Sequence, residues 1–168
     1  MTTAATLLAT LTEQHHHVKD LMHAVADGDT DRRAAFDEFR RFLAFHEAAE
    51  QVSIHPYRDR LGAESEVADQ RLVEEDEAGQ VLAELERMPL DSDEFLTTFR
   101  QLARAVVEHA EAEEHEELPL IDRLVGEDDL ARIHDLLAQV PELAGQADRS
   151  APFADLLQEA TEQFTARF

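Results

Sequence analysis

Two stretches of the sequence share one pattern, HEAAEQVSIHP beginning at His46 and HAEAEEHEELP beginning at His109. In each, a glutamate follows the histidine by four positions, at Glu50 and Glu113, and a proline follows six positions later. Side chains four apart on a helix lie about 40° apart on one face, so each pair can reach one metal centre. One such pair in an acidic chain is weak evidence, but two copies with the same trailing proline favour a metal-binding helical protein.

Apolar side chains recur at steps of three and four around these stretches, which is the spacing of an amphipathic helix. Phe39 and Leu43 lead into the first pair, and Phe99 and Leu102 lead towards the second. We predict four long helices and two shorter ones, over residues 3–26, 31–55, 65–88, 93–118, 128–140 and 153–168. The expected fold is all-α, an up-down antiparallel four-helix bundle with one or two additional C-terminal helices.

The 168 residues fit one domain, with the bundle at about residues 3–120 and a C-terminal helical extension at about 121–168. The extension has its own amphipathic spacing, as at Leu130, Ile133 and Leu137. It therefore either covers the bundle or forms a dimer surface.

The other two long helices also carry polar residues on their inward apolar stripes. In the first helix, His15 continues the line of Leu11 and Val18, so we choose it over its neighbours His16 and His17, which point sideways. The third helix contains no histidine, and Glu75 occupies the matching place. A shift of the helix by one residue would substitute Glu74 or Asp76 for Glu75.

The candidate metal ligands are therefore three imidazoles and three carboxylates. They are His15, His46, Glu50, Glu75, His109 and Glu113. This mixture suits iron or manganese, whereas zinc favours fewer, tetrahedral ligands. Six protein ligands leave open positions on two ions, where water or a small substrate could bind. Tyr57, the only tyrosine, is a candidate catalytic hydrogen-bond donor to a bound oxygen species, or it only caps the end of the bundle.

Composition excludes several other functions. Acidic residues outnumber basic ones by 38 to 15, a net charge of −23, so neither nucleic acid nor an anionic membrane is an expected partner. The absence of cysteine excludes disulfides, zinc fingers and thiol nucleophiles. We see no secretory signal and no apolar run that could span a bilayer, so we expect a cytoplasmic protein, either a monomer or a homodimer.

Three segments resemble the hemerythrin-like, or HHE cation-binding, family: LTEQHxxV ending at Val18, FHEAAE ending at Glu50, and HAEAEE ending at Glu114. The resemblance covers about residues 7–120. It implies an up-down four-helix bundle that holds two iron ions joined by an oxo or hydroxo bridge. The family usually places a histidine on the third helix, where alignment of the apolar positions puts Glu75.

A carboxylate in place of this imidazole adds negative charge beside the iron, which stabilises the ferric state. We therefore expect a di-iron oxidoreductase that acts on hydrogen peroxide or nitric oxide, with catalase-like or nitric oxide peroxidase activity, rather than a dioxygen carrier. The alternative is a non-catalytic protein that binds or senses oxygen, nitric oxide or iron. A purely structural bundle is disfavoured by the doubled motif.

Overall fold

The computed structural model describes residues 3–28, 31–60 and 65–168. Every regular element in these ranges is a helix, which confirms the all-α class. The elements are α1 (Thr3–Asp27), α2 (Arg32–Ser53), the 3-10 helix η1 (His55–Arg60), α3 (Ser65–Leu85), α4 (Asp93–Ala112), the π-helix η3 (Glu113–Glu117), α5 (Leu118–Leu124), α6 (Glu127–Leu137), α7 (Val140–Gln146) and α8 (Phe153–Thr165). None of the described helices is long and apolar enough to cross a lipid bilayer.

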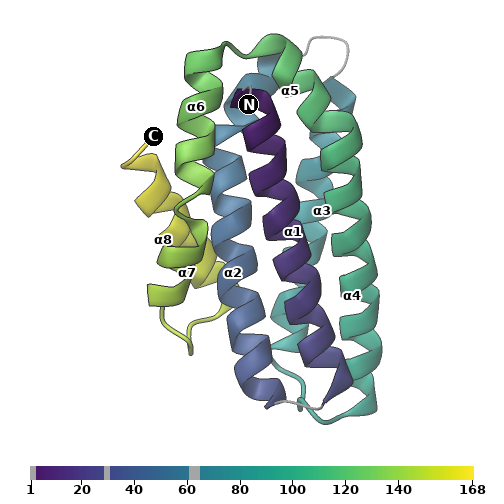
Figure 1. The fold of residues 1–168 in the computed structure, drawn as a ribbon. Helices are drawn as coiled ribbons and strands as arrows, with labels where there is room; N and C mark the ends of the chain where they lie inside the picture. The colour runs from purple at the N-terminus through teal and green to yellow at the C-terminus, as the bar shows by residue number, and fades with distance from the viewer. Residues whose placement is uncertain (1–2, 29–30, 61–64) are drawn as a thin grey trace.

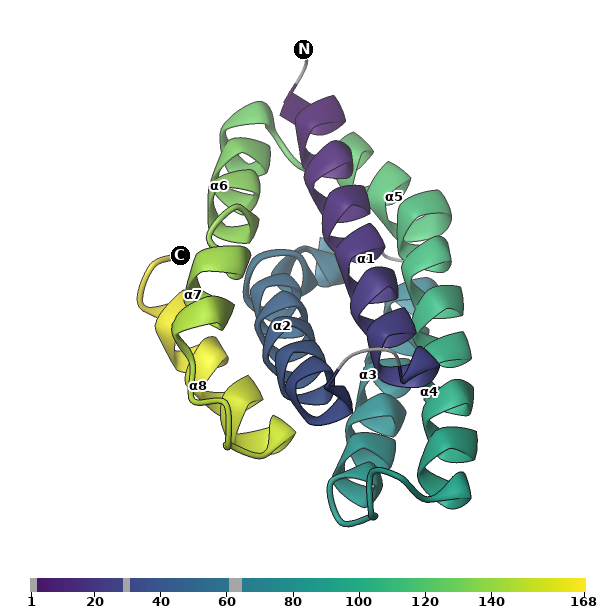
Figure 2. The ribbon, with the colours of Figure 1, turned by 60° about the horizontal axis from the view of Figure 1, so that its bottom comes forward.

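The four long helices α1 to α4 lie side by side, α5 continues from the end of α4, and α6, α7 and α8 lie on the side away from α4, next to α2 (Figure 1 and Figure 2). Helix α1 packs against α2 and α4, and α3 packs against α4. One end of the core is aromatic: the Phe36 ring lies 5.3 Å from Phe95, and the Phe39 ring lies 5.4 Å from Phe99, both edge to face. These fully buried rings make that end of the interior dry and apolar.

Local sequence signals explain where the long helices begin and end. The Asp31 carboxylate accepts the Ala34 N–H and begins α2, and the Ser92 hydroxyl accepts the Phe95 N–H and begins α4. Helix α1 ends before Gly28, whose φ of +71° lies in the left-handed region that favours glycine.

The predicted end of the fourth helix at residue 118 is wrong. The backbone widens into η3, where the Leu118 N–H donates to the Glu113 carbonyl five residues back. Pro119 then lies in the first turn of α5, a position that tolerates a residue without an N–H. The chain therefore remains helical from Asp93 to Leu124 instead of stopping at the proline.

The prediction of one or two C-terminal helices is also wrong, because three, α6, α7 and α8, follow residue 126. The extra helix α7 contains Pro141 and Gly145 and falls between the predicted helices at residues 128–140 and 153–168. Proline in the first turn is compatible with a helix start, and Pro141 occupies that place.

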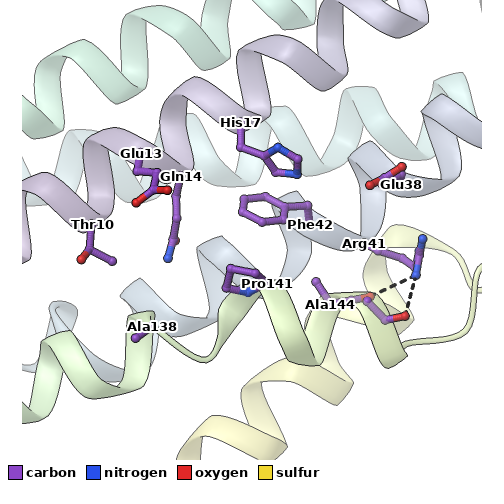
Figure 3. Close-up of a pocket in the computed structure, with 11 residues that line it drawn as sticks. Thr10, Glu13, Gln14, His17, Glu38, Arg41, Phe42, Ala138, Pro141 and Ala144 are labelled. Atoms are coloured by element: carbon purple, nitrogen blue, oxygen red, sulfur yellow. Dashed lines mark hydrogen bonds between the residues drawn. The ribbon is translucent and has the colours of Figure 1, made fainter.

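The C-terminal helices cover the bundle, the first of the two alternatives. Helix α8 buries Phe153, Leu156 and Phe164, and the Phe164 ring lies 6.1 Å from Phe45 of α2. Polar contacts add to this packing: the Arg41 guanidinium donates to the carbonyls of Ala144, at 3.1 Å, and Gly145, at 3.2 Å (Figure 3). As a result, α2 is covered on both its inner and outer sides.

Candidate metal centre

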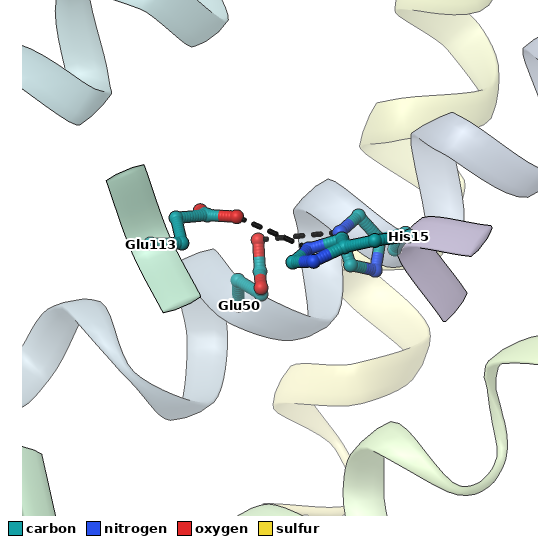
Figure 4. Close-up of side chains that lie close together, drawn as sticks. His15, Glu50 and Glu113 are labelled. Carbon is teal, nitrogen blue, oxygen red and sulfur yellow. Dashed lines mark ion pairs between the residues drawn. The ribbon is translucent and has the colours of Figure 1, made fainter. Parts of the chain in front are cut away.

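Buried histidine and glutamate side chains from α1, α2, α3 and the α4–η3 segment converge inside the bundle. Three overlapping groups have candidate ligand atoms that all lie within 4.8 Å of one another. The groups are His15, His46, Glu50 and Glu113; Glu47, Glu50 and His109; and Glu75, His109 and Glu113. All six residues predicted as ligands are thus brought together, and Figure 4 shows three of them from different helices.

Glu113 lies at the middle of this cluster. Its Oε2 is 3.2 Å from the Nε2 of His15, and its Oε1 is 2.9 Å from the Nε2 of His109. The Nε2 of His46 lies 3.6 Å from the Oε2 of Glu50, one helical turn away on α2. One carboxylate therefore faces two imidazoles with its two oxygens, as a carboxylate that bridges two ions would.

Each of the three imidazoles also makes a hydrogen bond through Nδ1, the ring nitrogen that faces away from the cluster. The partners of Nδ1 are Glu114 Oε1 for His15, at 2.7 Å, Gln14 Oε1 for His46, at 2.9 Å, and Glu74 Oε2 for His109, at 2.9 Å. These oxygens can only accept, so Nδ1 carries the proton and donates it. In the neutral imidazole that a metal requires, Nε2 is then left with a lone pair that faces the cluster, which is the arrangement of metal-ligating histidines.

Several buried polar atoms of the cluster have no hydrogen-bond partner within the described part of the chain. They are the Nε2 atoms of His15 and His109 and the Oε2 atoms of Glu47, Glu50 and Glu113. A buried polar atom without a partner costs about 1–3 kcal/mol, and here five such atoms lie together. A cation among them would accept their lone pairs, so the residues present fit a bound metal.

The two histidines of the repeated motif have opposite pKa shifts. Burial, and next the charge of His15, lowers the pKa of His46 from 6.5 to about 3. Burial also acts to lower the pKa of His109, but the charge of Glu113, whose Oε1 lies 2.9 Å from Nε2, outweighs it and raises that pKa to about 10. Without a metal, the second motif therefore contains a charged ion pair and the first a neutral imidazole.

The carboxylates are crowded enough to perturb one another. Burial raises the pKa values of Glu47 and Glu50 well above their usual range, and the neighbouring carboxylates add to this effect. Burial would also raise the pKa of Glu113, but His109 and then His15 reverse it and hold that pKa well below its usual range. Bound cations would supply the positive charge that this many buried acids lack.

The third helix presents Glu75 to the cluster. Its Oε2 accepts from the Gln51 side chain at 2.8 Å, and its Oε1 lies 3.2 Å from His55 Nε2. Of the two alternatives, Glu74 instead holds the outer nitrogen of His109, and Asp76 is exposed.

The sequence missed two buried acids at the cluster, Glu47 and Glu117. Glu47 follows His46 directly and lies three residues before Glu50, a spacing that places the two glutamates on neighbouring parts of one helix face and was a usable signal. Glu117 lies four residues after Glu113 in the same acidic run, which was a similar signal.

The other residues that the sequence singled out, His16, His17 and Tyr57, lie outside the ligand groups. His16 and His17 are exposed, as expected for residues beside the inward stripe. Tyr57 is buried in η1, and its backbone N–H donates to Ile54. A catalytic role for its hydroxyl remains a prediction.

Comparison with known families gives one match. A family model described as the Hemerythrin HHE cation binding domain matches residues 6–121, which is more than half of the chain. No curated protein and no solved structure matches. The matched range nearly coincides with the resemblance at residues 7–120, and it leaves α6, α7 and α8 outside.

Proposed function

Because the chain belongs to the hemerythrin HHE cation-binding family, we propose that it is a non-heme di-iron protein that reacts with small oxidants or gases. The proposed activity is removal of hydrogen peroxide or nitric oxide. In this proposal α1 to α4 form one up-down bundle, and the whole chain is a single domain.

The observation that carries the proposal is the overlap of the ligand groups. Glu113 belongs both to the group with His15 and His46 and to the group with Glu75 and His109. Two overlapping sets of ligands with a shared carboxylate support two ions rather than one. His15, His46 and Glu50 would hold one side of the pair, His109 and Glu75 the other, with Glu113 shared between them.

The protein side chains prepare this centre. Bound iron would supply electron exchange with a small oxidant and a place for it to bind. Gln14, Glu74 and Glu114 orient the imidazoles so that each presents Nε2. Glu47, with a raised pKa and an Oε2 without a hydrogen-bond partner in the described ranges, can hold a proton beside the centre.

The balance of ligands favours reaction over reversible oxygen carriage. The cluster contains Glu75 where the family usually has a histidine, and Glu47 adds a further buried carboxyl group. Carboxylate ligands stabilise ferric iron and lower its reduction potential. A resting ferric protein can accept electrons or react with peroxide, but it does not bind dioxygen reversibly.

The direct test is to purify the protein, quantify iron, and follow the visible spectrum and turnover on addition of peroxide and of nitric oxide. Two irons per chain with turnover would support the proposal. Fewer than about one metal ion per chain after iron-replete expression would contradict it. Two irons without turnover would favour the non-catalytic binding protein instead.

A further inference from the structure

A cleft of about 670 Å³ lies between α3 and α4 and reaches the proposed metal centre. The side chains at its inner end include Glu47, Glu75 and His109, all members of the ligand groups. The cleft also contains Arg71, which is not a member of any of these groups. It therefore joins the metal centre to the surface along a path that passes a guanidinium.

Arg71 is a buried cation with unused hydrogen-bond donors. Its side chain is only 4% exposed. Nη2 lies 3.0 Å from Glu74 Oε1, but Nε and Nη1 have no hydrogen-bond partner among the side chains and backbone atoms that the structure describes. These two nitrogens carry three N–H groups, because a guanidinium has one hydrogen on Nε and two on Nη1. These buried N–H groups are open to acceptor atoms, either from water or from a ligand.

The contact of Arg71 with Glu74 links it to the proposed centre. The second oxygen of Glu74, Oε2, lies 2.9 Å from Nδ1 of His109. Arg71 is thus two hydrogen-bonded steps from an imidazole that faces the cluster. A ligand on Arg71 would lie close enough to sense, or to be positioned for, chemistry at the metal.

We propose that Arg71 forms a binding site for a small, singly charged oxyanion in this cleft, such as hydroperoxide or nitrite. Unused N–H donors on a cation call for acceptor oxygens with negative charge. The exposed acids Glu77, Glu84 and Glu108 line the outer part of the cleft and would repel large or highly charged anions such as nucleotides. The site would hold the substrate or product oxyanion of the proposed function.

This inference rests on the proposed function, because bound cations are needed to balance the carboxylates around the site. The test therefore uses iron-loaded protein, measures iron content first, and then measures nitrite binding by calorimetry. Arg71→Gln removes the guanidinium. Arg100→Gln is the matched control, because it makes the same charge change at an exposed position on α4.

We expect the wild-type protein to bind nitrite, and Arg71→Gln to bind it at least about tenfold more weakly with its iron retained. Arg100→Gln should keep the wild-type affinity. Unchanged affinity in iron-loaded Arg71→Gln, or no nitrite binding to wild-type protein, would overturn the site.

A second measurement avoids dependence on the folding of a variant. A crystal of the iron-loaded wild-type protein soaked in bromide should show an anomalous peak within hydrogen-bonding reach of Arg71 Nε or Nη1. The absence of a peak there would overturn the site. Nitrite bound at Arg71 without turnover of peroxide or nitric oxide would keep the site and remove the proposed reaction. Turnover of peroxide or nitric oxide, with nitrite binding unaffected by Arg71→Gln, would keep the proposed reaction and remove the Arg71 site.

Discussion

The His/Glu pairs of α2 and α4 have the same spacing in the sequence, yet they meet different electrostatic surroundings. The neutral amide of Gln14 holds the outer nitrogen of His46, whereas the carboxylate of Glu74 holds that of His109. The pKa is about 3 for His46 and about 10 for His109. The difference arises because burial and His15 act on His46, whereas Glu113 outweighs burial at His109. The repeated motif thus fixes where the candidate ligands stand, while the burial and charge around each pair set the charge of its imidazole.

We call the ligands around His46 and those around His109 the two halves of the proposed centre. The largest loss of iron should follow removal of Glu113, the carboxylate that both halves share. Glu113→Ala should reduce iron to less than about half an ion per chain, because both ligand sets lose a member. Glu111→Ala is the control, since Glu111 is an exposed acid in the last turn of α4, two residues before Glu113. Iron quantified by mass spectrometry of the purified variants provides the measurement. Two retained irons in Glu113→Ala would mean that Glu113 is not shared.

The second prediction separates the two halves by pH in the metal-free protein. The pKa of His109 rises from 6.5 unfolded to about 10 folded, so its contribution to stability is complete below pH 6.5 and is lost as pH rises towards 10. The raised pKa values of Glu47 and Glu50 also make stability fall as pH rises. The lowered pKa of His46 acts only below pH 6.5.

We therefore expect the Tm of the metal-free protein to fall by at least about 4 °C between about pH 6.5 and about pH 8.5, at about 2–4 °C per kcal/mol. His109→Gln should flatten this fall, while His46→Gln should leave it in place. Thermal unfolding followed by circular dichroism in chelator-treated samples would measure both. If the Tm of both variants changed equally with pH, the proposed electrostatic difference between His46 and His109 would be wrong.

The third prediction exchanges the outer partners. Glu74→Gln gives His109 a neutral partner like that of His46, and should raise the reduction potential of the iron by on the order of tens of millivolts. Gln14→Glu makes the opposite exchange and should lower the potential. Potentiometric titration of the visible bands would compare them, with iron content as the control. Shifts of the same sign in both variants would contradict the assigned roles.

The smallest expected effect, a modest loss of peroxide turnover, concerns Tyr57, which has no counterpart beside the second motif. Tyr57 follows the proline of the first motif, whereas Leu120 follows that of the second. Tyr57→Phe should leave iron content unchanged and lower peroxide turnover by about threefold, if the hydroxyl donates a hydrogen bond to the oxidant. Full turnover in this variant would leave Tyr57 only its packing role.

The inward positions of the cluster could be predicted from the sequence because they interrupt helical apolar stripes. His15 and Glu75 were found in this way, without any motif of their own. The residues behind the imidazoles were not found, because Gln14, Glu74 and Glu114 act across helices and their spacing within one helix carries no such signal.

More residues of α2 are buried than a single inward apolar stripe predicts. Residues 39–50 are all buried, because α7 and α8 cover the outer side of this helix. A residue beside the inward stripe, such as Glu47, is then enclosed instead of exposed. The continuation of the helix through Pro119 escaped prediction for a related reason, since the wide turn of η3 depends on the backbone and not on a recognisable residue pattern.

In the proposed centre, two ions share Glu113, one on the side of His46 and the other on the side of His109. The most direct measurement is the crystal structure of the iron-loaded protein, with anomalous scattering recorded at the iron edge. We predict two iron peaks about 3.5–4 Å apart, with Glu113 contacting both. A single peak, or peaks away from the His46 and His109 imidazoles, would contradict a two-ion centre that shares Glu113.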